Sequence, residues 1–131
     1  MRSRATDVAS YALVVVLTVE LAVWGCFLVA ARPFGQPLPV AALVAVVGNT
    51  AVGLAGARVL GRRLGAVVPA VLWLGIALTL GSARPEGDVV VTETFRGLAF
   101  LFAGTVAAAA AVALSGARHG AGASPGASGG R

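Results

Sequence analysis

One ionisable side chain lies deep inside a long apolar stretch of the sequence. Glu20 is about 12 residues from either end of the stretch that covers residues 8–31. A carboxyl at this depth in a membrane costs free energy and points by default to a functional site. Removal from water favours the neutral carboxyl, so that a proton or a cation competes for it. Glu20 is therefore the first candidate for chemistry.

Polar side chains also stand near the midpoints of three further apolar stretches. Asn49 and Thr50 lie in the second stretch, Trp73 in the third and Thr105 in the fourth. If neighbouring stretches pack antiparallel, Glu20 and Asn49 meet at one depth. One interpretation is a proton or cation site; the other is a protonated Glu20 hydrogen-bonded to Asn49, a link that fixes helix register and contributes about 1 kcal/mol. The second is favoured, because no other carboxyl and no histidine lies within the apolar stretches to build a relay.

Four apolar stretches must position these side chains. They cover residues 8–31, 40–57, 64–81 and 95–115. At about 1.5 Å per residue, each is long enough to cross or nearly cross a bilayer core, with Pro69 expected to kink or tighten the third. Short linkers force antiparallel neighbours, and the alternation typical of a β-barrel is absent. The sequence predicts an all-α fold: a four-helix transmembrane bundle with antiparallel up-down topology.

The composition agrees with a membrane domain followed by a tail. Of the 131 residues, 58% are hydrophobic and 11% are charged, and the mean hydropathy is +0.92. A soluble domain averages about 25% charged residues, which excludes an ordinary water-soluble fold. The first apolar stretch exceeds the roughly 7 to 15 residues of a signal-peptide core, so we expect a retained anchor. The membrane domain covers residues 1–115, and residues 116–131, rich in Gly, Ala and Ser, are expected to be a disordered cytoplasmic tail.

The ten basic residues are all arginines, and most lie at the ends of the apolar stretches. With four crossings, seven lie on one side: Arg2, Arg4, Arg58, Arg62, Arg63, Arg118 and Arg131. Three lie on the other: Arg32, Arg84 and Arg96. The positive-inside rule then predicts a multi-pass membrane protein with a cytoplasmic N-terminus and a cytoplasmic C-terminus. The run from Arg58 to Arg63 is interpreted as a topology determinant rather than an anionic-lipid site, and no nucleic acid is expected as a partner.

The loop between the third and fourth stretches would face outward. It holds three of the five acidic residues. Pro and Gly in one segment of this loop are placed as in a tight turn. The segment consists of Arg84, Pro85, Glu86, Gly87 and Asp88. Thr92 or Thr94 is expected to cap the fourth helix.

Small residues recur every four positions in two of the stretches. One stripe consists of Ala41, Ala45, Asn49, Gly53 and Ala57, and the other of Ala99, Ala103, Ala107 and Ala111. Small residues at this spacing let helix backbones approach closely in lipid. Each stripe is suited to packing within the chain or to docking a helix of a partner. The expected partners are therefore the lipid bilayer and another membrane protein or a second copy of the chain.

The sequence shows none of the residue patterns of a soluble enzyme. It has no Ser-His-Asp set, no metal-spaced cluster and no phosphate-loop motif. Cys26 is the only cysteine, which excludes an intramolecular disulfide and a zinc site built on cysteines. We expect no catalytic residue, no cofactor, no metal and no enzymatic activity.

Three segments carry a resemblance to a known group of proteins. They are residues 61–65 leading into Trp73, the Arg84-Pro85-Glu86-Gly87-Asp88 loop, and the Arg96-Gly97 start of the fourth helix. Together they resemble a family of small, uncharacterised actinobacterial integral membrane proteins, and this resemblance implies a four-span protein of the inner (plasma) membrane with no assigned activity. Glu20 and Trp73 also fit the outline of the small multidrug resistance exporters, and this likeness implies proton-coupled export. We expect a structural or accessory membrane subunit, with proton-coupled export of a small molecule as the alternative.

Overall fold

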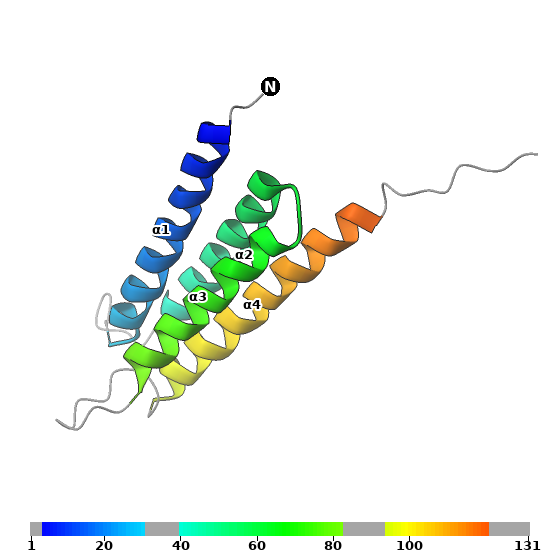
Figure 1. Cartoon of the computed structure of the whole chain (residues 1–131). Coiled ribbons are helices and arrows are strands. Elements are labelled where there is room, and N and C mark those ends of the chain that lie inside the picture. The colour runs from blue at the N-terminus through cyan, green and yellow to red at the C-terminus, as the bar shows by residue number, and fades with distance from the viewer. Residues whose placement is uncertain (1–3, 31–39, 83–93, 121–131) are drawn as a thin grey trace, which may run out of the picture.

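The computed structural model describes residues 4–30, 40–82 and 94–120, which fold into a bundle of four helices. The helices are α1 (Arg4–Ala30), α2 (Val40–Leu60), α3 (Leu64–Gly81) and α4 (Phe95–Gly120). Successive helices alternate in direction, so that the start of α1 and the end of α4 lie at the same end of the bundle (Figure 1). The described ranges contain no strand. The predicted all-α, up-down fold is confirmed.

Each helix is long and apolar enough to cross a membrane. The candidate spans are Arg4–Val29, Val40–Leu60, Leu64–Gly81 and Phe95–Ala117, with mean hydropathies between 1.9 and 2.4. The shortest has 18 residues and a length of about 27 Å, close to the hydrocarbon core of a bilayer. Only 33% of the most apolar part of each span is buried inside the bundle. Most of the apolar surface therefore faces outward, as a lipid environment requires.

Three helices extend beyond the predicted boundaries. α1 begins at Arg4 rather than at residue 8, α2 ends at Leu60 rather than at residue 57, and α4 continues to Gly120 rather than stopping at Ser115. Loss of apolar character marks the edge of lipid, but a helix can continue past that edge. Arg58 even suits the last turn of α2, where a cation complements the negative end of the helix dipole.

The extension of α4 makes the first five residues of the expected tail, 116–120, helical. Residues 121–131, the rest of the expected tail, and the outward loop Arg84–Asp88 lie outside the described residues. At the start of α4, the Thr94 Oγ1 accepts a hydrogen bond from the Gly97 N–H at 3.1 Å. This confirms Thr94 as the capping residue of the two that the sequence suggests.

A tight turn joins α2 to α3. Gly61 has φ = 60°, the left-handed conformation that ends helices and that glycine adopts without strain. The N–H groups of Gly65 and Ala66 then donate to the carbonyl oxygens of Arg62 and Arg63, each at 3.0 Å. α3 therefore starts at once, and α2 and α3 form an antiparallel hairpin.

Two glycines let this hairpin close tightly. A Cβ at Gly56 would collide with the backbone oxygen of Gly65, and a Cβ at Gly65 would collide with that of Gly56. Pro69 lies buried inside α3, four residues after Gly65, and has no N–H to donate to the Gly65 oxygen. That oxygen can therefore face α2 without losing a helical hydrogen bond.

Two aromatic rings connect the helices in the interior. Trp73 and Phe100 are fully buried, with ring centroids 5.4 Å apart and an angle of 59° between the planes. A Cβ at Gly104 would overlap the Trp73 ring, and a Cβ at Gly25 would overlap the Phe100 ring. The absence of these two Cβ atoms lets α4 pack close to both α3 and α1.

The small-residue stripe of α2 faces the interior. All five of its members are buried: Ala41, Ala45, Asn49, Gly53 and Ala57. A Cβ at Gly53 would lie 2.7 Å from the Cβ of Ala111, which is buried together with Ala107 of the α4 stripe. The two stripes thus meet where Gly53 faces Ala111, whereas Ala99 and Ala103 of the α4 stripe are half-buried. Packing within the chain is the use that the structure shows for them.

Candidate functional site

Glu20 lies on the outer side of α1, away from the other helices. The buried residues of α1 recur every four positions, as Val14, Thr18, Ala22 and Cys26. At about 100° per residue, Glu20 is turned roughly 200° from Thr18. Its side chain is accordingly exposed.

A hydrogen bond holds the Glu20 carboxyl on this surface. The Trp24 indole Nε1–H, one turn further along α1, donates to Glu20 Oε2 at 3.0 Å. Trp24 is 63% exposed, so both members of the pair belong to the outside of the bundle. An ionised carboxylate accepts about four hydrogen bonds, and a neutral one also donates. Most of the hydrogen-bonding capacity of Glu20 is thus unused by other described residues.

The expected hydrogen bond between Glu20 and Asn49 is not formed. Asn49 is 1% exposed, and neither its Oδ1 nor its Nδ2 has a hydrogen-bond partner. A Cβ at Gly48 would overlap the Leu21 side chain, so the neighbours of the two polar residues do meet. The two depths agree as antiparallel packing predicts, but Glu20 points out of the bundle and Asn49 points in.

The other polar residues of the expected layer are also not joined to Glu20. The hydroxyls of Thr50 and Thr105 donate to the carbonyl oxygens four residues earlier in their own helices, at 2.8 and 2.7 Å. The Trp73 Nε1 is buried and has no hydrogen-bond partner. Trp73 and Thr105 line one groove of about 160 Å³ between α3 and α4, so these two residues are brought together.

One buried polar residue, Thr18, did not figure among the sequence candidates. It is fully buried, and its hydroxyl donates to the Val14 carbonyl oxygen at 2.8 Å. The available signal was its position four residues before Ala22 and eight before Cys26, both small. The stripe of Thr18, Ala22 and Cys26 marks the inner side of α1, and Glu20 lies on the opposite side of the helix.

The exposed side of α1 is here called the outer α1 face. It consists of Leu13, Val16, Leu17, Glu20, Trp24 and Phe27. In a bilayer, an ionised residue near the centre of a helix costs about 2.5 to 3.5 kcal/mol. One hydrogen bond from Trp24 offsets about 1 kcal/mol of this. A polar side chain of a partner that hydrogen-bonds to Glu20 would lower the remaining free-energy cost of placing the carboxyl in lipid.

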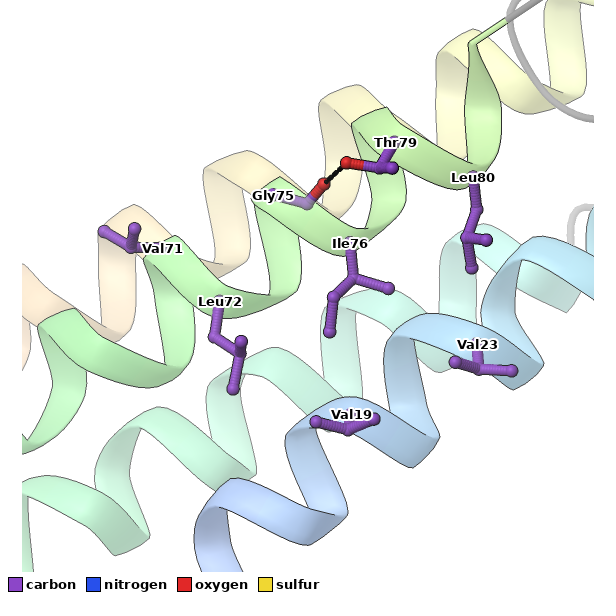
Figure 2. Close-up of a pocket in the computed structure, with 8 residues that line it drawn as sticks. All are labelled: Val19, Val23, Val71, Leu72, Gly75, Ile76, Thr79 and Leu80. Atoms are coloured by element: carbon purple, nitrogen blue, oxygen red, sulfur yellow. Dashed lines mark hydrogen bonds between the residues drawn. The ribbon is translucent and has the colours of Figure 1, made fainter. Parts of the chain in front are cut away.

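A groove lies beside this face, between α1 and α3. It encloses about 610 Å³ and is lined by Val19, Val23, Val71, Leu72, Gly75, Ile76, Thr79 and Leu80. Figure 2 shows Leu72, Ile76 and Leu80 directed from α3 toward the turns of α1 that carry Val19 and Val23. The single hydroxyl, that of Thr79, donates to the Gly75 carbonyl oxygen at 2.7 Å. The groove is therefore apolar.

Metal ligands and thiols were the remaining candidates for chemistry among the described residues. Those residues contain no group of three or more His, Cys, Asp or Glu side chains placed to hold a metal ion. Cys26 is a free, buried thiol on the inner side of α1. That the protein has no catalytic residue, cofactor or metal stays a prediction.

Comparison with known proteins identifies the family. The model of a family of unknown function, DUF6113, matches residues 1–131, and the chain belongs to this family. No curated protein and no solved structure matches the chain. The expected membership of an uncharacterised family is confirmed, whereas the actinobacterial source and the likeness to exporters stay predictions.

Proposed function

We propose that this member of the family is an accessory subunit of a membrane complex. In this proposal the outer α1 face docks on a transmembrane helix of another protein. The observation that carries the proposal is the Glu20 carboxyl, which points away from its own bundle and is hydrogen-bonded to Trp24 alone among the described residues. The small-residue stripe of α2 is buried within the chain, so the proposal assigns the docking to the outer α1 face instead.

The chemistry of Glu20 defines the partner. A polar side chain in lipid is stabilised by hydrogen bonds across a helix interface. A fitting helix carries a basic or amide side chain at the depth of Glu20, with small or apolar residues around it. The side chains of Trp24 and Phe27 then supply apolar contact area beside the polar pair.

A different protein suits this face better than a second copy. A second copy would present another Glu20, and two like carboxylates at one depth repel each other instead of forming an ion pair. The described arginines lie near the ends of the bundle: Arg4 begins α1, Arg58 is in the last turn of α2, Arg62 and Arg63 are in the α2–α3 turn, Arg96 is in the first turn of α4, and Arg118 is in its last turns. None of them lies at the depth of Glu20, so the described part of the chain offers no cation for the carboxyl.

Co-purification from native membranes, with variants of Glu20, tests the proposal. Glu20→Gln keeps an acceptor for the Trp24 N–H and removes the ionisable group, whereas Glu20→Leu removes both. We expect the complex to weaken in the first variant and to be lost in the second. The bundle should melt at an unchanged temperature in both, because Glu20 makes no hydrogen bond to another described helix.

Thr105→Leu is the matched control, because Thr105 is also an exposed polar residue in mid-helix, on α4. This variant should keep the complex. A protein that purifies without a stoichiometric partner, or a complex that survives Glu20→Leu, would refute the accessory role.

The proposal includes a location: the inner (plasma) membrane, with both termini in the cytoplasm. The arginine distribution supports it, because the start of α1, the α2–α3 turn and the end of α4 lie at one end of the bundle (Figure 1). A reporter fused after Arg131 should be active only in the cytoplasm. Activity on the opposite side would overturn this orientation.

Proton-coupled export is the second candidate. The groove of about 610 Å³ between α1 and α3 favours it, because an apolar groove beside a titratable carboxyl suits a hydrophobic cation. Purified protein in liposomes should then move a cationic dye when a pH gradient drives the transport, and Glu20→Gln should abolish the movement. Dye transport that depends on Glu20 would replace the accessory role as the function of this chain.

A further inference from the structure

One end of the bundle gathers most of the described positive charge. Arg4 begins α1, Arg58 lies in the last turn of α2, and Arg62 and Arg63 form the turn into α3. All four are exposed, and Asp7 is the one acidic residue of the described chain at this end. Such clusters at the edge of a span attract the anionic headgroups of lipids.

Two of these arginines have structural roles. Arg58 complements the negative end of the α2 dipole. The Arg63 side chain runs along α4, because a Cβ at Gly116 would lie 3.5 Å from its Cδ and Nε. Arg62 is exposed in the α2–α3 turn, at the end of the bundle where α1 begins (Figure 1).

Tyr11 supplies a second polar group at this place. Its hydroxyl is buried and has no hydrogen-bond partner. The inward side of α1 is less covered here than further along: Asp7, Ser10 and Tyr11 are half-buried, whereas Val14 and Thr18 are buried. A buried hydroxyl without a hydrogen-bond partner costs free energy. A ligand oxygen that accepts a hydrogen bond from the Tyr11 O–H would therefore be stabilised there.

We propose that this end of the bundle binds the phosphate of an anionic phospholipid headgroup, with Arg62 as the charged donor and the Tyr11 hydroxyl as the neutral donor. A guanidinium and a hydroxyl both donate to phosphate oxygens, and the fork of arginine allows two parallel hydrogen bonds. Arg62 falls between the spans Val40–Leu60 and Leu64–Gly81, at the level where headgroups lie. The position favours a lipid over a soluble phosphate ester, although the phosphate chemistry is the same.

Native mass spectrometry of the purified full chain tests the site, with phosphatidylglycerol and phosphatidylcholine as probes. The wild-type chain should retain phosphatidylglycerol preferentially. Arg62→Gln should weaken this retention about fivefold and Tyr11→Phe about twofold to tenfold, whereas Arg62→Lys, which keeps the charge, should lose less. Arg96→Gln, at the opposite end of the bundle, is the matched control and should change nothing.

Several results would overturn the proposal. These are equal retention of the two lipids by the wild-type chain, full retention by Arg62→Gln, or an equal loss in Arg96→Gln. Displacement of the lipid by millimolar inorganic phosphate would assign the site to a soluble phosphate compound instead. Melting curves of each variant show whether the bundle is folded. If Arg62→Gln does not fold, Arg62→Lys still tests the site.

Discussion

The contact between Gly56 and Gly65 leads to a quantitative prediction on stability. Gly56→Ala gains helix propensity worth about 1 kcal/mol, but its Cβ collides with the backbone oxygen of Gly65. A backbone atom cannot move away by changing a rotamer, so α2 and α3 must separate. Overpacking of this kind costs about 1–3 kcal/mol.

Gly75→Ala is the matched control for this variant. Nothing lies within 4 Å of the position that a Cβ at Gly75 would take, so the substitution keeps only the gain in helix propensity. Gly56→Ala should therefore be less stable than Gly75→Ala by about 1–3 kcal/mol, which is about 5- to 150-fold in the folding equilibrium.

The assay is equilibrium unfolding of the full chain in mixed micelles with a rising fraction of denaturing detergent, followed by circular dichroism. The free energies of unfolding of the two variants are compared directly. Equal stability of the two, or a more stable Gly56→Ala, would refute the close backbone approach of α2 and α3.

Three further substitutions test local features by the same unfolding assay. Thr94→Ala removes the acceptor of the Gly97 N–H and should cost about 1 kcal/mol; an unchanged midpoint would argue against the cap. Gly61→Ala places a side chain at φ = 60° and should cost about 1–2 kcal/mol, and a stabilised variant would contradict the left-handed turn. Asn49→Val removes two buried polar atoms that have no partner and should change the stability by less than about 1 kcal/mol or raise it. A loss above about 2 kcal/mol would show that Asn49 is in fact hydrogen-bonded.

Helix number, order and depth were accessible to sequence reasoning. The length of the apolar stretches and their short linkers leave few alternatives to an up-down bundle. The contact between Leu21 and Gly48 shows that the depths of α1 and α2 were matched correctly as well. Helix number, order and depth follow from the number of residues in each apolar stretch and linker, and these numbers can be read from the sequence.

The rotation of each helix about its axis was harder to predict. In lipid, apolar residues suit both the outside and the inside of a bundle, so the hydrophobic pattern of α1 does not mark its inner face. Small residues mark it instead, as Ala45 and Gly53 do on α2 and as Ala22 does on α1. Glu20 was expected to face inward because of its polarity, and the small-residue rule places it outside.

Helix ends were predicted less well than helix centres. α4 continues past Ser115, where the apolar stretch stops, because a hydrogen-bonded helix does not end where its side chains become polar. The lone glycine at residue 61 was a usable stop signal for α2, since it adopts the left-handed conformation that closes a helix. Specific backbone signals thus mark helix ends better than average hydropathy does.

Site-specific photo-cross-linking in native membranes tests the docking of the outer α1 face most directly. A photoreactive residue replaces Phe27 on this face or, as a control, Phe102 on the exposed side of α4. We predict an adduct from Phe27 to a transmembrane helix of a different protein that carries a basic or amide side chain at the depth of Glu20. The adduct should be lost with Glu20→Leu and with replacement of that partner side chain by leucine. No adduct, an adduct of twice the mass of this chain, or an adduct that persists in Glu20→Leu would contradict the proposed function.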